Sequence, residues 1–199
     1  MSWSEAHPNS ATLDRLESGM RYRLVLIVAP QGAGKTRLLR EWVWERSKNR
    51  SPAPAWVTLE QRDNDIEIFL QHLIAAFAGI KPQLESLLRP IRQDKKLQAI
   101  QKNRQIPSDP GTFNTEDVLI VLINLLAGFP QEIALILDEV HLIESPEVNQ
   151  AISFFIDYLP KNVHMYLATR SQPQFGIAHL RARREIMEIG HADFFTSLK

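Results

Sequence analysis

Five short hydrophobic runs divide the chain, and longer segments of mixed polarity separate them. The runs span residues 24–28, 55–59, 133–137, 163–169 and 185–189. The first (LVLIV) and the third (IALIL) are continuous rather than alternating, and both contain β-branched side chains. Continuous runs of this length are typical of strands that are buried on both faces of a parallel sheet.

Between the runs, hydrophobic residues recur at the spacing of an α-helix. One helix is expected soon after the first run, because Leu38, Leu39, Trp42 and Val43 share this spacing. Trp44 lies two residues from Trp42, so the two indoles cannot both face the core, and we expect Trp42 to be buried. The other helical segments are expected at residues 10–20, 66–80, 115–126, after Pro146, and at 177–183.

The alternation of strands and helices predicts an α/β fold, in which a parallel sheet has helices on both faces. A length of 199 residues fits one domain, or one domain with an appendage. We expect an N-terminal segment with a short helix at residues 1–22 and the main domain at 23–199. Residues 81–112 are polar, charged and interrupted by prolines, which indicates a helical excursion on the surface.

Composition and charge exclude several classes of protein. The chain has 23 Lys and Arg residues and 23 Asp and Glu residues, so it lacks the basic excess of a nucleic-acid-binding domain. It has no cysteine, which excludes disulfides and thiolate metal sites. It shows neither a signal peptide nor a transmembrane stretch, so we expect a cytoplasmic protein without a membrane partner.

A phosphate-binding loop is the strongest motif. Residues 29–36 (APQGAGKT) match the pattern GxxxxGK[ST] except that Ala29 replaces the first glycine. The motif lies between an expected strand and an expected helix, where free N–H groups and the helix dipole favour an anion. In such a loop Lys35 reaches the β- and γ-phosphates, and Thr36 offers its hydroxyl to Mg²⁺. The alternative is an ordinary glycine-rich turn.

Two adjacent carboxylates, Asp138 and Glu139, end the third hydrophobic run. Carboxylates at the end of a buried strand are costly unless they are solvated or used. Together with the phosphate loop they predict a Walker B strand, in which Asp138 holds Mg²⁺ and Glu139 polarises the attacking water. The alternative is that the pair simply begins an acidic loop.

Arg170 follows the fourth run and could contact the γ-phosphate of a bound nucleotide. A surface arginine at a strand end is the alternative. His141 lies three residues after Asp138. We expect it to form a hydrogen bond within its loop, and a contact with the γ-phosphate is the second possibility.

Taken together, these segments resemble the nucleotide-binding domain of MalT-type transcriptional activators. These are large ATP-binding LuxR-family regulators in the STAND class of signal-transduction ATPases. The resemblance runs from about residue 12 to residue 196 and is weakest near 81–112. It is carried by APQGAGKT, AWVTLEQRDNDIEIFLQHLIAAF, LILDEVHLI, SFFIDYLP, YLATRSQP, FGIAHLRAR and MEIG.

The resemblance implies a P-loop NTPase fold, a three-layer sandwich whose five-stranded parallel sheet has the order 5-1-4-3-2. It implies that N–H groups of Gln31, Gly32, Ala33 and Gly34 bind phosphate and that nucleotide contacts continue through Lys35, Thr36 and Arg37. Catalytic roles fall on Lys35, Glu139 and Arg170, and the metal ligands are Thr36 and Asp138. The motif Asp63-Asn64-Asp65 matches a DND-like element, which we interpret as a turn and helix cap.

The resemblance also implies a switch function. ADP would hold the resting state, and ATP with an inducer would favour self-association and activation of transcription, with slow hydrolysis resetting the switch. Relatives contain winged-helix, helical-repeat and helix-turn-helix modules that this sequence does not contain, so DNA binding is expected only through such a module. The chain is either an excised domain or a truncated relative.

Three other functions remain open. A P-loop phosphotransferase would need an acceptor pocket and a lid with arginines. An AAA+-like ATPase would need a ring and an arginine from a neighbouring subunit. A stand-alone P-loop protein could bind the nucleotide without hydrolysing it. None of the three requires a direct role in transcription.

Overall fold

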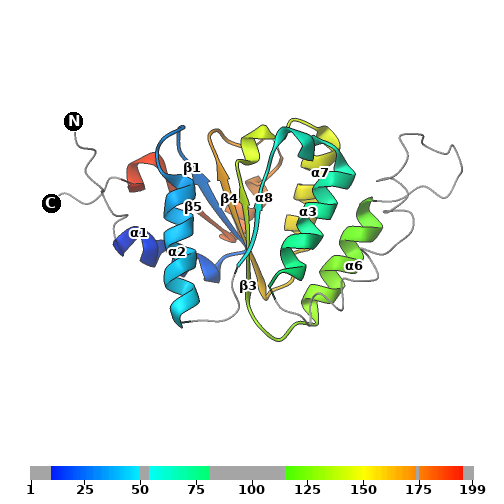
Figure 1. Cartoon of the computed structure of the whole chain (residues 1–199), viewed down its shortest axis with the longest axis horizontal. Helices are drawn as coiled ribbons and strands as arrows, with labels where there is room; N and C mark the ends of the chain where they lie inside the picture. The colour runs from blue at the N-terminus through cyan, green and yellow to red at the C-terminus, as the bar shows by residue number, and fades with distance from the viewer. Residues whose placement is uncertain (1–9, 50–53, 81–114, 174, 195–199) are drawn as a thin grey trace, which may run out of the picture.

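The computed structural model describes residues 10–49, 54–80, 115–173 and 175–194. The excursion expected at 81–112 lies outside these residues. The described residues form one parallel sheet that lies between two layers of helices (Figure 1).

The sheet has five strands in the order β2-β3-β4-β1-β5. All of the strand pairs are parallel. The strands are β1 (Leu24–Val28), β2 (Ala55–Thr58), β3 (Ile133–Asp138), β4 (Val163–Thr169) and β5 (Ile186–Gly190). The predicted fold class and strand order are therefore confirmed.

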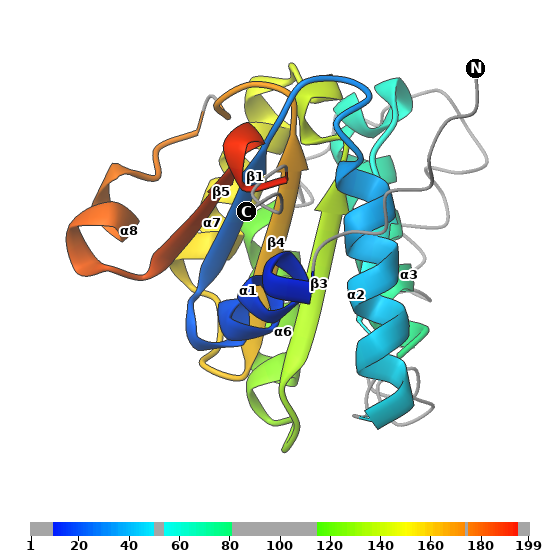
Figure 2. The same cartoon turned by 90° about the vertical axis from the view of Figure 1, so that its left-hand side faces the viewer.

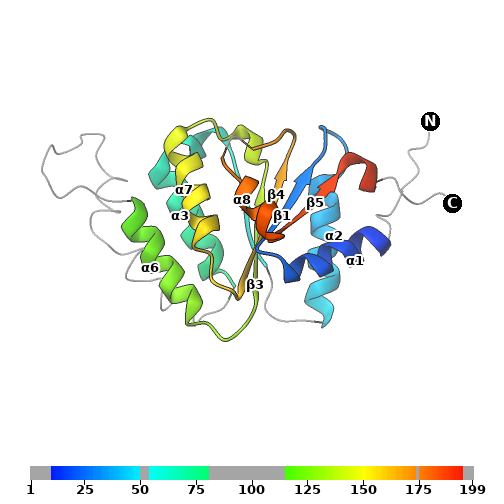
Figure 3. The same ribbon diagram turned by 180° about the vertical axis from the view of Figure 1, so that it is seen from behind.

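Successive side chains of β1 point to opposite faces of the sheet and so separate the helices into two layers. Val25 and Ile27 pack in the core that contains α1 (Ser10–Ser18) and α2 (Lys35–Asn49). Leu24 and Leu26 pack in the larger core on the other face. That face carries α3 (Ile66–Ala78), α6 (Thr115–Ala127), α7 (Pro146–Asp157) and α8 (Ala178–Arg183). Figures 2 and 3 show the two layers from the side and from behind.

The α1–α2 layer is held by aromatic packing. The Trp42 ring lies 4.5 Å from the Tyr166 ring, and the Tyr166 hydroxyl donates to the Leu16 carbonyl at 2.9 Å. Gly19 allows α1 to approach the sheet, because an added Cβ would lie 2.6 Å from Cγ2 of Val25. As expected, Trp42 is buried, whereas Trp44 is 62% exposed.

Most expected element boundaries lie within two residues of the observed ones. β3 extends one residue further than expected, to Asp138, because its pairing with β2 continues to the Thr58–Asp138 pair. β5 begins and ends one residue later than expected, because it pairs with β1 from Leu24–Ile186 to Val28–Gly190. β3 therefore carries Asp138 as its last residue, at the carboxyl end of the sheet.

The helix starts follow local capping chemistry. Asp65 accepts hydrogen bonds from the Glu67 and Ile68 amides at the start of α3, and Ser145 accepts one from Val148 at the start of α7. α1 packs in the same core as α2, and the boundary between residues 22 and 23 stays a prediction. Among the described residues, no helix has the length and apolar character needed to span a membrane.

Candidate functional site

The connection between β1 and α2 adopts the backbone of a glycine-rich loop. Gly32 has a φ of 79° and Gly34 a φ of 89°. Residues other than glycine rarely adopt such positive φ values. A Cβ added to either glycine would meet no atom within 4 Å, so open space lies beside the loop. The loop leads into the first turn of α2, whose N–H groups have no acceptors within the helix. This combination suits an anion with several oxygens.

Lys35 places a cation within this loop. Its ammonium group donates to the Ala29 carbonyl at 2.7 Å and to the Pro30 carbonyl at 3.2 Å. The residue is only 5% exposed. Burial lowers the pKa of Lys35, and the nearby carboxylates of Glu139 and Asp138 oppose this effect. A cation that is held only by carbonyl dipoles is able to exchange them for a phosphate.

Thr36 and Asp138 join the loop to the end of β3. The Thr36 hydroxyl donates to Oδ2 of Asp138 at 2.7 Å, and Oδ1 of Asp138 accepts from the Glu139 amide at 2.9 Å. Hydroxyl and carboxylate oxygens suit Mg²⁺, which usually takes few protein ligands and completes its shell with phosphate and water. Accordingly, the described residues contain no cluster of three His, Cys, Asp or Glu side chains that could hold a metal alone.

Glu139 has a strained backbone that the sequence pattern did not signal. Its φ of 60° and ψ of 34° lie in the left-handed region, which costs a residue with a side chain about 1–2 kcal/mol. Its carboxylate oxygen Oε2 lies 3.3 Å from Nδ1 of His141 and 3.5 Å from Nη2 of Arg170. Strain of this kind concentrates at functional sites.

Arg170 reaches the glycine-rich loop from the end of β4. Its Nη1 donates to Oε1 of Gln31 at 3.0 Å, and its Nη2 faces Glu139. The structure therefore brings together the side chains of Gln31, Lys35, Thr36, Asp138, Glu139 and Arg170. The Arg37 side chain lies apart from this group, because it is about half exposed and 4.0 Å from Glu41.

The expected loop hydrogen bond of His141 is wrong. Within the described part of the chain, neither ring nitrogen has a hydrogen-bond partner, although Nδ1 lies 3.3 Å from Glu139. The His141 side chain is 14% exposed. Burial lowers the pKa of His141, and the charge of Arg170 lowers it further, whereas Glu139 opposes both effects.

The motif Asp63-Asn64-Asp65 does more than turn the chain and cap a helix. Asp65 is the expected cap of α3. Asp63 is fully buried, and it binds the Glu60 amide at 2.7 Å and Nδ1 of His72 at 2.6 Å. Asn64 forms hydrogen bonds with the connection that follows Glu139. The sequence interpretation missed these contacts, because no local pattern reveals a partner about 80 residues away.

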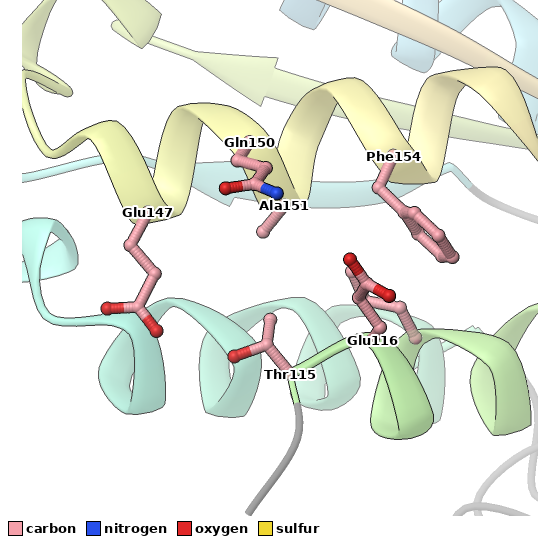
Figure 4. Close-up of a pocket in the computed structure, with 7 residues that line it drawn as sticks. Thr115, Glu116, Glu147, Gln150, Ala151 and Phe154 are labelled. Carbon is pink, nitrogen blue, oxygen red and sulfur yellow. The ribbon is translucent and has the colours of Figure 1, made fainter.

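A separate cavity of about 220 Å³ lies between α6 and α7 (Figure 4). Its lining includes the carboxylates Glu116 and Glu147. Burial, followed by the charges of Asp65 and Glu147, raises the pKa of nearby Glu67. No residue of the glycine-rich loop lines this cavity, so the cavity is separate from that loop.

Comparison with known proteins agrees with this geometry. The family model described as "AAA ATPase domain" matches residues 10–167. The HTH-type transcriptional regulator MalT of Klebsiella pneumoniae is 33% identical over 178 residues, which cover 89% of this chain and 18% of the relative. MalT of Cronobacter sakazakii is 30% identical over 181 residues, with the same coverage of 89% and 18%. The chain thus spans about a fifth of the length of these relatives.

Two solved structures share the fold. A Signal Transduction ATPase with Numerous Domains (STAND) protein with a tetratricopeptide repeat sensor, from Pyrococcus horikoshii, matches with a TM-score of 0.56 and 15% identity. That match covers 96% of this chain and 24% of the other. Cdc6p of Pyrobaculum aerophilum matches with a TM-score of 0.51 and 14% identity, over 94% of this chain and 48% of the other.

Proposed function

Because this chain belongs to the AAA ATPase domain family, we propose that it binds ATP and Mg²⁺ as the switch domain of a signal-responsive transcriptional regulator of the STAND type. Family membership implies nucleotide binding. The choice of a regulator is supported by the named MalT relatives, which match over 89% of this chain. The two similar STAND and Cdc6p structures support the fold alone.

The observation that carries the proposal is the hydrogen bond between Thr36 and Asp138. It joins a phosphate-binding loop to a carboxylate at the end of β3, and the buried Lys35 lies beside both. An ordinary glycine-rich turn requires neither a buried lysine nor a carboxylate contact. The phosphotransferase alternative lacks a comparable supporting contact among the described residues.

Each residue of the cluster has a role in nucleotide binding. Amides from Gln31 to Arg37 bind the phosphate oxygens, and Lys35 leaves the Ala29 and Pro30 carbonyls to reach the β- and γ-phosphates. Thr36 and Asp138 hold Mg²⁺. The bound ion neutralises negative charge on the phosphates.

Hydrolysis resets the switch slowly. Glu139 accepts a proton from the water whose oxygen attacks the γ-phosphorus, the bond between this phosphorus and the β–γ bridging oxygen breaks, and ADP leaves. Arg170 donates hydrogen bonds to the γ-phosphate. Arg170 must first give up Gln31 and Glu139, which frees the Glu139 carboxylate for water. ADP maintains the resting state, and ATP favours self-association. Binding to DNA takes place through a further module of the longer protein.

The first test is isothermal titration with ATP and ADP, with and without Mg²⁺. Lys35→Ala is expected to weaken ATP binding roughly 10- to 100-fold, because a charge-assisted bond to phosphate contributes about 1.5–3 kcal/mol. Lys48→Ala, which removes an exposed cation from the same helix, serves as the control. Absence of ATP binding in the parent protein would refute the proposal.

Turnover is tested separately with Glu139→Gln. We expect ATP affinity to persist and hydrolysis to fall at least about 100-fold, as is usual when a general base is lost. An unchanged rate would show that the base is another residue. Light scattering with ADP and with ATP then compares the two states. The proposed switch is monomeric with ADP and self-associates with ATP, whereas an assembly that persists with ADP would favour an AAA+-like ring.

A further inference from the structure

Asn64 connects two loops that are far apart in the sequence. Its Nδ2 donates to the Leu142 carbonyl at 2.9 Å. Its Oδ1 accepts from the Glu144 and Ser145 amides, each at 2.7 Å. One side chain therefore binds three backbone groups of the connection between β3 and α7. This is the connection that contains Glu139.

The backbone of Asn64 is held in place by its own turn and by α3. It lies in the short 3₁₀ turn Gln61–Asn64, which is closed by reciprocal bonds between Glu60 and Asp63. Asp63 is fully buried and contacts His72 of α3. Asp65 caps α3. The turn is thus attached to α3 on both sides of Asn64, and the asparagine has a rigid base.

The path from Asn64 to Glu139 is short. The Leu142 carbonyl accepts from Asn64, and the Leu142 amide donates to the Glu139 carbonyl at 3.0 Å. Two hydrogen bonds in series therefore connect the asparagine to the residue with the strained backbone. A left-handed glutamate persists only where surrounding contacts hold it. On its far side, the same connection is held by Ser145, whose amide binds Asn64 and whose hydroxyl caps α7.

We propose that Asn64 is a positioning residue for ATP hydrolysis, which fixes the backbone of residues 142–145 so that Glu139 keeps its left-handed conformation and its carboxylate faces the phosphate site. This inference rests on the hydrolysis proposed above. Within the described part of the chain, the hydrogen bonds of Asn64 go to Gln61, Leu142, Glu144 and Ser145, none of which is assigned to nucleotide binding. Its loss therefore affects the rate of the chemical step rather than the affinity for nucleotide.

The test compares Asn64→Ala with a matched variant at the other end of β3. Asn162 donates from Nδ2 to the carbonyls of Leu126, Phe129 and Gln131. Like Asn64, it is half-buried and binds three backbone groups, here at the end of α6 and in the connection that follows. Asn162→Ala thus removes a similar set of bonds away from Glu139. Stability, kcat and KM for ATP are measured for both variants and for the parent.

We expect Asn64→Ala to lower kcat at least about 10-fold, as small displacements of a catalytic group do, and to leave KM for ATP within about twofold. Asn162→Ala is expected to lose comparable stability and keep the parental kcat. Hydrogen exchange of residues 139–145 is expected to quicken in Asn64→Ala alone.

Asn64→Asp keeps an acceptor for the Glu144 and Ser145 amides but cannot donate to Leu142. This variant therefore tests only the hydrogen bond that connects Asn64 through Leu142 to Glu139, and we expect kcat to fall here too. It replaces Asn64→Ala as the test if Asn64→Ala does not fold. A kcat in Asn64→Ala and Asn64→Asp equal to that of Asn162→Ala overturns the inference alone. A parent that binds ATP without turnover overturns both the inference and the proposed hydrolysis.

Discussion

The two ends of the sheet use polar side chains in different ways. At the amino end, Arg23 and Asn162 each donate hydrogen bonds to three carbonyls of neighbouring connections. Neither residue has a strained backbone. At the carboxyl end, Lys35 is held by its own loop, and the backbone of Glu139 is left-handed.

This difference separates stability from function within one sheet. The amino-end contacts satisfy helix and loop carbonyls that would otherwise lack donors, so they stabilise the fold. The carboxyl end keeps the buried cation Lys35 and, at Glu139, a left-handed residue within the candidate site. Both destabilise the fold unless a ligand compensates them. Ligands of parallel sheets bind at that end. Substitutions at the two ends should therefore have opposite effects on stability and on nucleotide chemistry.

The largest effect on stability is expected from Arg23→Ala. Arg23 Nη1 lies 3.0–3.2 Å from the carbonyls of Ile156, Asp157 and Leu159 at the end of α7, and its Nε lies 3.0 Å from Glu185. Removal should lower the free energy of unfolding by about 2 kcal/mol, because these are charge-assisted bonds at a helix C-terminus. Urea unfolding measures this change.

The same variant should bind ATP with the parental dissociation constant. Lys48→Ala removes an exposed ion pair and is expected to change stability by less than about 0.5 kcal/mol. If Arg23→Ala bound ATP more weakly at a temperature where it is folded, the amino end would also affect nucleotide binding. The proposed division between stability at one end and function at the other would then be wrong.

The sequence was informative where a pattern is local. Short hydrophobic runs, of which the first and third are continuous, predicted all five strands, and the phosphate-loop motif predicted which turn contains Lys35. Residues at the carboxyl ends of β1, β3 and β4 had to lie close together, because parallel strands bring those ends to one edge. The cluster of Lys35, Asp138 and Arg170 could therefore be predicted without coordinates. Its precise roles in hydrolysis stay predictions.

The sequence was uninformative where a feature depends on distant contacts. The left-handed backbone of Glu139 results from the surrounding connection, since glutamate has no preference for that conformation. The bonds of Asn64 reach across about 80 residues, and an asparagine before a helix suggests only a turn. His141 was expected to form a hydrogen bond within its loop, but in the described part of the chain neither ring nitrogen forms one, although Nδ1 lies 3.3 Å from Glu139.

A smaller effect is expected from Glu139→Gly. Glycine accepts the left-handed conformation without strain, although it gains entropy in the unfolded chain. The net result should be a rise in unfolding free energy of up to about 1 kcal/mol, with hydrolysis abolished. Arg184 is the matched control, because it also has a positive φ, 57°, at the end of α8.

Arg184→Gly should gain similar stability and keep the parental ATPase rate. Thermal unfolding and phosphate release measured on both variants test this pair. If Glu139→Gly were destabilised while Arg184→Gly was stabilised, side-chain contacts of Glu139 would outweigh its strain. The left-handed backbone of Glu139 would then not be a net cost to stability, unlike the same conformation at Arg184, which precedes β5 at the amino end.

The smallest effect concerns the pH dependence of stability at His141. Burial, reinforced by Arg170, lowers the pKa of this imidazole in the folded protein, whereas the unfolded chain titrates near the ordinary value of about 6.5. Below that pH the unfolded chain binds more protons than the folded one, so stability falls as the solution is acidified. Above the pKa of the unfolded chain, the neutral imidazole makes its full contribution to the free energy of unfolding.

His141→Gln removes this titration. In urea unfolding without nucleotide or Mg²⁺, the free energy of the parent minus that of His141→Gln should therefore decrease from pH 7 to pH 5. The same comparison in an Arg170→Gln background should show a smaller decrease, because one cause of the lowered pKa has been removed. A difference that stays constant, or increases, with acidification would mean that the His141 imidazole is not held neutral by its surroundings. The carboxyl end would then store less electrostatic strain than its buried groups indicate, and the left-handed Glu139 would be its main cost to stability.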